Sequence, residues 1–236
     1  MQTMPNHFEI YRTQAQQYDL LVRREDYQEN IEKALAHIIP REGLILVELG
    51  AGTGRLTRIL VPQARLIYAF DNSRHMLDAA RTALRNTNLQ NWSLAVCDHR
   101  HLPVQYRLSD AAISGWSVCY VVEGDLNCWR SELEKVLVEM RRVIHPEGML
   151  ILIETLGTGH ESPKAPDRLV PYYQYLESTG FQHTWIRTDY RFRDFKEAEE
   201  LTLFFFGNEM LGKIVRENDE IKLPECTGIW WLMQGS

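Results

Sequence analysis

Three glycines occupy alternate positions in the segment Leu46–Arg55, which reads LVELGAGTGR. The apolar run Leu44–Leu49 before them suits a buried strand, and the residues after them have the apolar spacing of a helix. Gly50, Gly52 and Gly54 lack Cβ atoms, so the chain can turn sharply and bring backbone N–H groups close to a ligand at the helix N-terminus. Turns of this kind usually hold a nucleotide-like cofactor.

The residues around the glycines distinguish between two such cofactors. A dinucleotide-binding turn has the pattern G-x-G-x-x-G, whose third glycine lets the helix pack closely on the strand. Counted from Gly50, that third position is Arg55. Glu48 lies two residues before the first glycine, where a carboxylate would gain little beside a pyrophosphate. Both departures disfavour NAD, and with it an NAD-dependent oxidoreductase.

The pattern E-x-G-x-G-x-G instead resembles the first motif of the class I S-adenosylmethionine-dependent methyltransferases. The resemblance implies that Glu48 faces the methionine end of S-adenosylmethionine, which carries an ammonium and a sulfonium. It also implies that the turn lines the cofactor through Gly50, Ala51, Gly52, Thr53 and Gly54. The product left after transfer would be S-adenosylhomocysteine.

Two more acidic residues follow predicted strands. Arg65–Phe70 predicts a second strand that leads into Asp71, about 20 residues beyond the first glycine, where an acid can accept hydrogen bonds from both ribose hydroxyls. The third predicted strand, Trp92–Cys97, leads into Asp98 and, a few residues later, a Leu-Pro pair. Methyltransferases of this class commonly have an acid here, and the resemblance implies that Asp98 accepts a hydrogen bond from the adenine amino group. The other residues expected at the cofactor are Tyr18, Asn72, Met76, His99, Ser114 and Gly115.

The rest of the chain alternates between strand and helix patterns. Further strands are predicted over Asp110–Ser114, Gly148–Thr155, Phe181–Phe192 and Thr227–Met233, and helices over Asp125–Ile144 with Asp125 as N-cap, over Leu169–Thr179, and from Glu197 toward Val215. These elements predict an α/β fold with a doubly wound, mostly parallel, seven-stranded sheet. The resemblance adds the strand order 3-2-1-4-5-7-6, with the last strand antiparallel.

We expect one methyltransferase domain over the whole chain. Its parts are predicted as an N-terminal helical lid over residues 1–40, a cofactor-binding half over 41–155 and an acceptor-side half over 156–236. Two amphipathic helices are predicted in the lid, one over Phe8–Val22 and one from Tyr27 to Ile38. In many small-molecule methyltransferases such a pair covers the cofactor. The segment Gln17–Asp19 resembles the part that reaches it, which makes Tyr18 a candidate.

Charge and composition limit the classes of binding partner that we expect. The formal net charge is -6 and Lys and Arg form no stripe, whereas a domain that binds a phosphate backbone is usually basic. A nucleic-acid partner is therefore not expected. No apolar stretch approaches the roughly 18 residues of a membrane span, and the first residues do not resemble a signal peptide, which predicts a cytoplasmic protein without a membrane partner. The cysteines form no C-x-x-C pair, so no metal site is predicted.

Methyl transfer requires an acceptor aligned with the methyl group and the sulfur, exclusion of water and, for some acceptors, removal of a proton. Acceptor-side residues are expected in loops that follow strands. Trp116 follows the fourth strand, and His160 is the candidate general base because histidine titrates near neutral pH. We predict direct in-line transfer to a small molecule. A protein or RNA acceptor, or a non-catalytic methyltransferase-like binding protein, are the alternatives.

Three adjacent aromatic residues bear on the lid and on self-association. Phe204, Phe205 and Phe206 fall within the predicted helix from Glu197, so their side chains point in directions roughly 100° apart. One face of a sheet cannot bury all three. We expect them to contact the lid of the same chain or a second copy, which leaves a monomer or a homodimer open.

Overall fold

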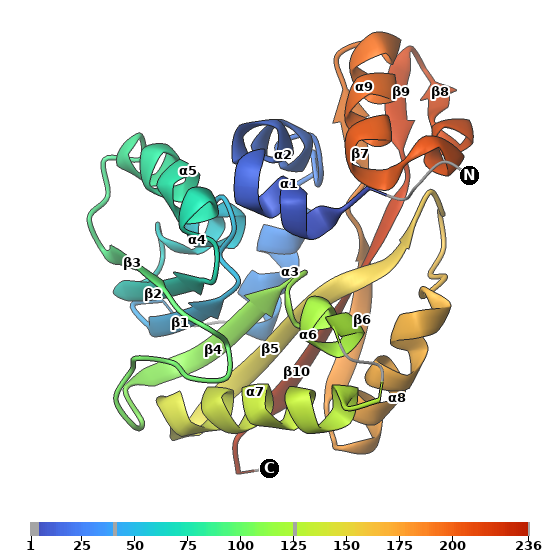
Figure 1. The fold of residues 1–236 in the computed structure, drawn as a ribbon. Coiled ribbons are helices and arrows are strands. Elements are labelled where there is room, and N and C mark those ends of the chain that lie inside the picture. Colours follow the sequence, from blue (N-terminus) through green and yellow to red (C-terminus); the bar gives the residue numbers. More distant parts are fainter. Residues whose placement is uncertain (1–4, 40–41, 125–126, 236) are drawn as a thin grey trace.

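The structure, a computed structural model, describes residues 5–39, 42–124 and 127–235. Its centre is a seven-stranded sheet in the order β3-β2-β1-β4-β5-β10-β6 (Figure 1). The strands are β1 (Ile45–Leu49), β2 (Leu66–Asp71), β3 (Trp92–Val96), β4 (Ser109–Gly115), β5 (Ile144–Thr158), β6 (Gln182–Arg187) and β10 (Glu225–Met233). Strands β1 to β5 pair in parallel, and β10 is antiparallel to both of its neighbours. The predicted order and the antiparallel last strand are confirmed.

Helices cover both faces of this sheet. One face carries α6 (Val118–Gly124), α7 (Trp129–Val143) and α8 (Val170–Ser178); the other carries α3 (Asn30–Ile38), α4 (Arg55–Leu60) and α5 (Arg74–Arg85). Strand β5 supplies both cores, because successive side chains of a strand point to opposite faces. Leu150 and Leu152 belong to the first core, while Ile151 and Ile153 belong to the second. All four are fully buried.

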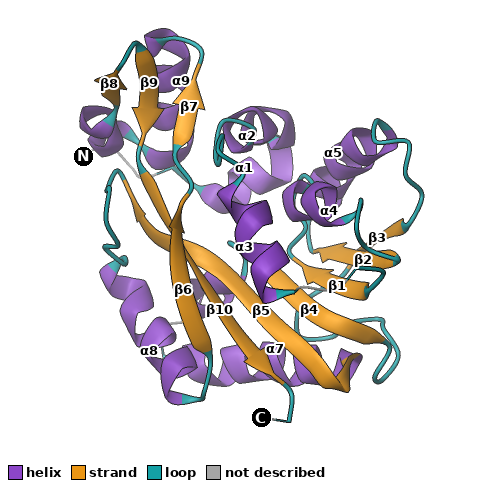
Figure 2. Ribbon diagram, turned by 180° about the vertical axis from the view of Figure 1, so that it is seen from behind, coloured by secondary structure: helices purple, strands orange, loops and turns teal. Residues whose placement is uncertain are grey.

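A second, smaller sheet stands beyond one end of the large one (Figure 2). It consists of β7 (Tyr190–Phe192), β9 (Glu220–Leu223) and β8 (Val215–Glu217), in that order. The prediction of one strand over Phe181–Phe192 is wrong, because the chain leaves the large sheet after Arg187 and β7 pairs with β9. An alternating apolar pattern has the same period in either sheet and does not show which one a strand joins.

The predicted first helix over Phe8–Val22 is two helices in the structure. They are α1 (His7–Thr13) and α2 (Ala15–Val22), separated at Gln14, whose φ of -128° and ψ of 33° lie outside the helical region. We call α1 and α2 together the lid. The next helix, α3, begins at Asn30, later than the predicted Tyr27, after Glu29 in a left-handed conformation.

Two other helix boundaries differ from expectation. Helix α9 (Phe195–Phe206) begins two residues before the predicted Glu197, with the Asp194 carboxylate accepting a hydrogen bond from the Glu197 N–H. It ends at Gly207, whose φ of 83° breaks the helix, and 3₁₀ turns follow over Asn208–Lys213. Helix α7 begins at Trp129; Asp125, the predicted N-cap, lies outside the described residues. Helix α6 and a 3₁₀ turn, η1 (Asp167–Leu169), were not predicted.

The lid lies between α5 and α9 (Figure 1). On the α5 side, the Ser73 hydroxyl donates a hydrogen bond to the Tyr11 carbonyl over 2.8 Å. On the α9 side, the His7 ring stacks on Phe205 with 4.4 Å between ring centres. The expected contact with the lid is thus confirmed within one chain for Phe205, whereas the Phe206 ring packs on Tyr190.

Candidate active site

Two cavities adjoin at the carboxyl ends of the parallel strands. The larger cavity, of about 1030 Å³, extends from the glycine turn over the ends of β2 and β3. The smaller cavity, of about 430 Å³, lies toward the lid, the end of β5 and the start of β10. The residues that line both are Tyr11, Tyr18, Gly50, Gly52, Gly115, Trp116 and Tyr120. The two cavities therefore meet beside the glycine turn, under the lid.

The glycine turn is packed so tightly that one position excludes any side chain. A Cβ on Gly50 would lie 2.0 Å from the Ser117 hydroxyl oxygen, and the φ of this residue is +73°. Gly54 has a different neighbour, because its Cβ would contact Ala80 of α5 at 3.2 Å. The lack of a side chain at Gly50 thus leaves room for Ser117 in the cavity wall. The lack of one at Gly54 allows α4 and α5 to approach each other.

Asp71 is held in place by the backbone of the surrounding turns. Its Oδ2 accepts a hydrogen bond from the Gly52 N–H over 2.9 Å, and its Oδ1 accepts one from the Ser73 N–H over 2.7 Å. Burial raises the pKa of Asp71, and these two N–H groups oppose that rise. The carboxyl group lines the larger cavity and keeps lone pairs that can accept further hydrogen bonds from a ligand.

Asp98 and His99 line the far part of the larger cavity. Asp98 forms an ion pair with Arg100 over 2.6 Å, and hydrogen bonds from Arg100 lower its pKa below the ordinary range. His99 is buried, and burial lowers its pKa to about 4, so the ring is neutral at pH 7. Its Nε2 lies 2.6 Å from the Ser117 hydroxyl. The pair offers a charged acceptor beside an uncharged ring.

Glu48 is 1% exposed and lines the smaller cavity next to the glycine turn. Its Oε2 accepts a hydrogen bond from the Thr57 hydroxyl over 2.6 Å. Burial raises its pKa to about 7, so about half of the molecules carry an ionised Glu48 near neutral pH. A cation bound beside it would favour the ionised form.

Most residues predicted at the cofactor line one or both cavities. In the larger cavity are Tyr18, Gly50, Gly52, Asp71, Asn72, Met76, Asp98, His99 and Gly115; Glu48, Ala51 and Thr53 line the smaller one. Two predicted residues line neither of these cavities. Gly54 packs on α5, and Ser114 is fully buried within β4.

Trp116 lies where the cavities meet and has an unusual backbone conformation. Its φ of 48° is in the left-handed region, which is strained for a residue with a bulky side chain. The Arg55 guanidinium lies 4.3 Å from the centre of its ring. Arg55 also forms an ion pair of 2.6 Å with Glu25. This places a buried cation against the indole ring, with its paired anion on Glu25.

His160 lines the smaller cavity but not the part shared with the larger one. Burial and the charges of Lys164 and Lys213 lower its pKa. It therefore lies among basic residues, which keeps the ring neutral at pH 7. Its role as a general base remains a prediction.

Two buried acids in the smaller cavity were not predicted. Glu25 lies between the lid and α3, and Glu225 is the first residue of β10. Glu225 Oε1 accepts a hydrogen bond from the Thr155 hydroxyl over 2.7 Å, and burial raises its pKa to about 8. In the sequence, Glu225 could have been found as an acidic residue at the start of a mostly apolar strand. Glu25 stands in a charged segment that resembles an exposed loop.

A family model matches the central part of the chain. Residues 47–152 match the model described as a methyltransferase domain. The chain is also 21% identical over 162 residues to an uncharacterized methyltransferase of Anoxybacillus flavithermus, a match that covers 66% of this chain and 71% of that protein.

Solved structures share the fold. A SAM-dependent methyltransferase of Aquifex aeolicus superimposes with a TM-score of 0.54 at 18% identity, covering 86% of this chain and 88% of that chain. The YcgJ protein of Bacillus subtilis gives a TM-score of 0.58 at 11% identity, covering 88% and 99%. Residues 47–152 thus match a methyltransferase domain, and the chain has the fold of the class I S-adenosylmethionine-dependent methyltransferases, as the glycine turn predicted. S-adenosylmethionine is the cofactor of this class.

Within the described residues, no helix is long and apolar enough to cross a membrane. The same ranges contain no group of three or more His, Cys, Asp or Glu side chains placed to hold a metal ion.

Proposed function

We propose that the protein transfers a methyl group from S-adenosylmethionine, bound in the larger cavity, to a small molecule bound in the smaller one. The observation that carries this proposal is the meeting of the two cavities beside the glycine turn. A direct displacement needs the acceptor atom and the sulfonium on opposite sides of one methyl group. Two adjoining cavities with one shared wall provide that arrangement, and residues of a single chain enclose both.

The three predicted acids and the glycine turn each have a chemical task in this proposal. Asp71 accepts hydrogen bonds from the ribose hydroxyls, and Asp98 accepts one from the adenine amino group beside the neutral His99 ring. Backbone N–H groups of the glycine turn approach the methionine carboxylate. Glu48 lies toward the ammonium and sulfonium, whose charge favours its ionised form. When bound, S-adenosylmethionine supplies the activated methyl group.

Aromatic side chains enclose the point of transfer. Tyr11, Tyr18, Trp116 and Tyr120 all line both cavities. Aromatic faces attract cations, so these rings stabilise a sulfonium while excluding water. Trp116 is then a wall of the acceptor site, and His160 a candidate proton acceptor at its far side.

The size of the smaller cavity favours a small acceptor over a macromolecule. Small-molecule sites typically measure about 300 to 1000 Å³, and this cavity of about 430 Å³ lies under the lid. The net charge of -6 also disfavours a nucleic acid. A protein side chain reaching into the cavity is the alternative.

Two measurements test the proposal. Calorimetric titration should detect binding of S-adenosylmethionine and S-adenosylhomocysteine but not of NAD. A screen of small acceptors and of peptides, with S-adenosylhomocysteine formation as the readout, should then give turnover with a small molecule. Cofactor binding without turnover on any acceptor would favour a non-catalytic binding protein, and turnover on peptides alone would overturn the small-molecule assignment.

A further inference from the structure

Building on the proposed function, we propose that the methyl acceptor is an amine whose nitrogen donates hydrogen bonds to Glu25 and Glu225, and that Glu225 takes up the proton that the nitrogen loses. The assignment deepens the proposed reaction by naming its acceptor class. It rests on the two acids that sequence analysis did not single out.

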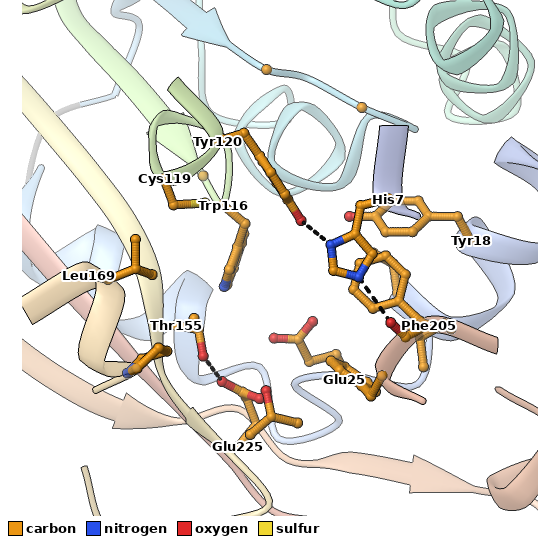
Figure 3. Close-up of a pocket in the computed structure, with 18 of the residues that line it drawn as sticks. His7, Tyr18, Glu25, Trp116, Cys119, Tyr120, Thr155, Leu169, Phe205 and Glu225 are labelled. Carbon is orange, nitrogen blue, oxygen red and sulfur yellow. Dashed lines mark hydrogen bonds between the residues drawn. The ribbon is translucent and has the colours of Figure 1, made fainter. Parts of the chain in front are cut away.

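Both carboxyl groups have an oxygen without a partner. Glu25 is 9% exposed and Glu225 is 2% exposed. Within the part of the chain that the structure describes, Glu25 Oε1 and Glu225 Oε2 make no hydrogen bond. Both residues line the smaller cavity and point into it (Figure 3). A buried acceptor without a donor costs free energy, and a ligand with N–H groups would remove that cost.

The buried charges of the cavity favour a donor-rich, cationic ligand. Arg55 is the buried cation beside these acids, and it already pairs with Glu25 over 2.6 Å. Within the described residues Glu225 forms no ion pair, and the charge of Arg55, which it shares with Glu25, lowers its pKa only in part against burial. Two other titratable groups act on Glu225: the Glu25 carboxylate, whose charge raises its pKa, and the phenol of Tyr190, whose own pKa is raised by burial so that it is uncharged at neutral pH. An ammonium group supplies both the missing charge and up to three donors.

Other acceptor classes match this cavity less well. A hydroxyl group has a single donor and no charge, so it can satisfy only one of the two oxygens. A carboxylate has no donor, so it can satisfy neither of the two oxygens. The aromatic residues Trp116 and Tyr190 also line the cavity, and their faces attract cations.

The proposed proton transfer balances the reaction. An ammonium nitrogen has no free electron pair, so it first gives one proton to the Glu225 carboxylate. The neutral nitrogen then forms a bond to the methyl carbon, while the carbon–sulfur bond breaks and its electron pair stays on sulfur. The products are S-adenosylhomocysteine and a methylated ammonium, with the proton on Glu225. The raised pKa of Glu225, about 8, gives it the proton affinity for this step.

A matched series of probes tests the inference on the full chain saturated with S-adenosylhomocysteine. The probes are 2-phenylethylamine, 2-phenylethanol and phenylacetate, whose binding is measured by calorimetry. We expect the amine to bind at least about tenfold more tightly than the alcohol, since hydrogen bonds to charged groups are the stronger ones, and phenylacetate to bind most weakly. With S-adenosylmethionine in its place, only the amine should yield S-adenosylhomocysteine.

Two variants supply the control. Glu225→Gln should weaken amine binding about tenfold or more and leave the dissociation constant of S-adenosylmethionine unchanged, which also shows that the variant is folded. Glu154→Gln should leave amine binding unchanged, because Glu154 is a buried acid on β5 with a pKa also raised to about 8, yet it does not line the smaller cavity.

Failure of the inference differs from failure of the proposed function. The amine assignment is overturned if the alcohol or phenylacetate binds as well as the amine, if no probe binds, or if the two variants behave alike. The probe series in the unaltered protein does not depend on any variant folding. If S-adenosylhomocysteine itself does not bind, the proposed function fails instead.

Discussion

The hydroxyl oxygens of Tyr11 and Tyr120 lie 2.6 Å apart and join the lid to α6 across the place where the two cavities meet. The direction of this hydrogen bond follows from His7. Its Nε2 lies 3.0 Å from the Phe205 carbonyl, which can only accept, so Nε2 carries the proton. The other ring nitrogen, Nδ1, then accepts from the Tyr120 hydroxyl over 3.4 Å. Tyr11 must therefore donate to Tyr120.

Removing the Tyr11 hydroxyl should loosen the lid. Tyr11→Phe deletes the donor and leaves the ring, so we expect a loss of about 1 kcal/mol, seen as a rise of about fivefold in the dissociation constant of S-adenosylmethionine. Hydrogen exchange of residues 7–22 should become faster. Tyr106→Phe, on an exposed ring, is the control. Unchanged exchange and affinity would show that the bond does not close the lid.

Removing the charge of Asp71 should weaken cofactor binding specifically. Asp71→Asn keeps the shape but puts an NH₂ group where the carboxylate now accepts from the Gly52 and Ser73 N–H groups. A loss of about 1.5 to 3 kcal/mol for a charge-assisted hydrogen bond corresponds to a dissociation constant about 10 to 100 times higher. Calorimetry measures this dissociation constant, and Asp78→Asn, which changes an exposed residue of α5, is the control. A folded variant with normal affinity would contradict the assignment.

A methyl group at Gly50 should destabilise the protein through one identifiable overlap. The new Cβ of Gly50→Ala would lie 2.0 Å from the Ser117 hydroxyl oxygen, and overpacking of this kind typically costs about 1 to 3 kcal/mol. Gly212→Ala, where nothing lies within 4 Å of the added Cβ, should be close to neutral in denaturant unfolding. The double variant with Ser117→Gly should recover part of the loss. No recovery would mean that backbone strain at the positive φ causes the effect.

Three buried carboxyl groups should each reduce the stability of the protein as the pH rises. Burial raises the pKa of Glu48 to about 7 and those of Glu154 and Glu225 to about 8, from an ordinary value of 4.5. Below pH 4.5 these groups are protonated in both folded and unfolded chains. Between pH 4.5 and about 7 for Glu48, or about 8 for Glu154 and Glu225, each group ionises mainly in the unfolded chain, so it lowers the free energy of unfolding.

The variant Glu154→Gln removes one of these groups. It should make the decrease in unfolding free energy between pH 5 and 8 shallower by up to about 1.4 kcal/mol per pH unit, measured by denaturant unfolding at several pH values. The exposed Glu147→Gln should leave the slope unchanged. An equal slope in Glu154→Gln and the wild type would show that Glu154 is ionised when folded.

The pH dependence of turnover distinguishes two proton acceptors. A base must be unprotonated to act, so a rate that depends on Glu225 should fall as the pH drops below about 8. A rate that depends on His160 should fall only below its ordinary value of 6.5, because its pKa is lowered. We expect the first profile in the wild type and in His160→Ala. If the rate of the wild type falls only below pH 6.5, and this fall is absent in His160→Ala, the histidine is the proton acceptor.

The cofactor half was predictable because its signals are local. The glycine turn, Asp71 and Asp98 each follow directly from the end of a strand, and parallel strands bring their carboxyl ends to one edge. The order of the strands came from family resemblance. Gly54 and Ser114 belong to the same motifs, yet their place against α5 and inside β4 depends on packing.

The acceptor half was not predictable in the same way. Glu25, Arg55 and Glu225 come from three distant parts of the sequence and meet only in the folded chain. The split between β6 and β7 also depends on tertiary structure, since β7 pairs with a strand that begins at Glu220. Local pattern carries no information about such contacts.

The smaller sheet has a consequence for how such a protein can diversify. The chain leaves the large sheet at Thr188 and returns at Glu225, and the N–H of Thr188 donates a hydrogen bond of 3.0 Å to the Glu225 carbonyl. The hydroxyl groups of Thr188 and Thr227 also form a hydrogen bond, with their oxygens 2.6 Å apart. The residues between Thr188 and Glu225, α9 included, form an insertion whose two ends lie next to each other. Its length and sequence can therefore change during evolution while the pairing of β6 with β10 stays as it is.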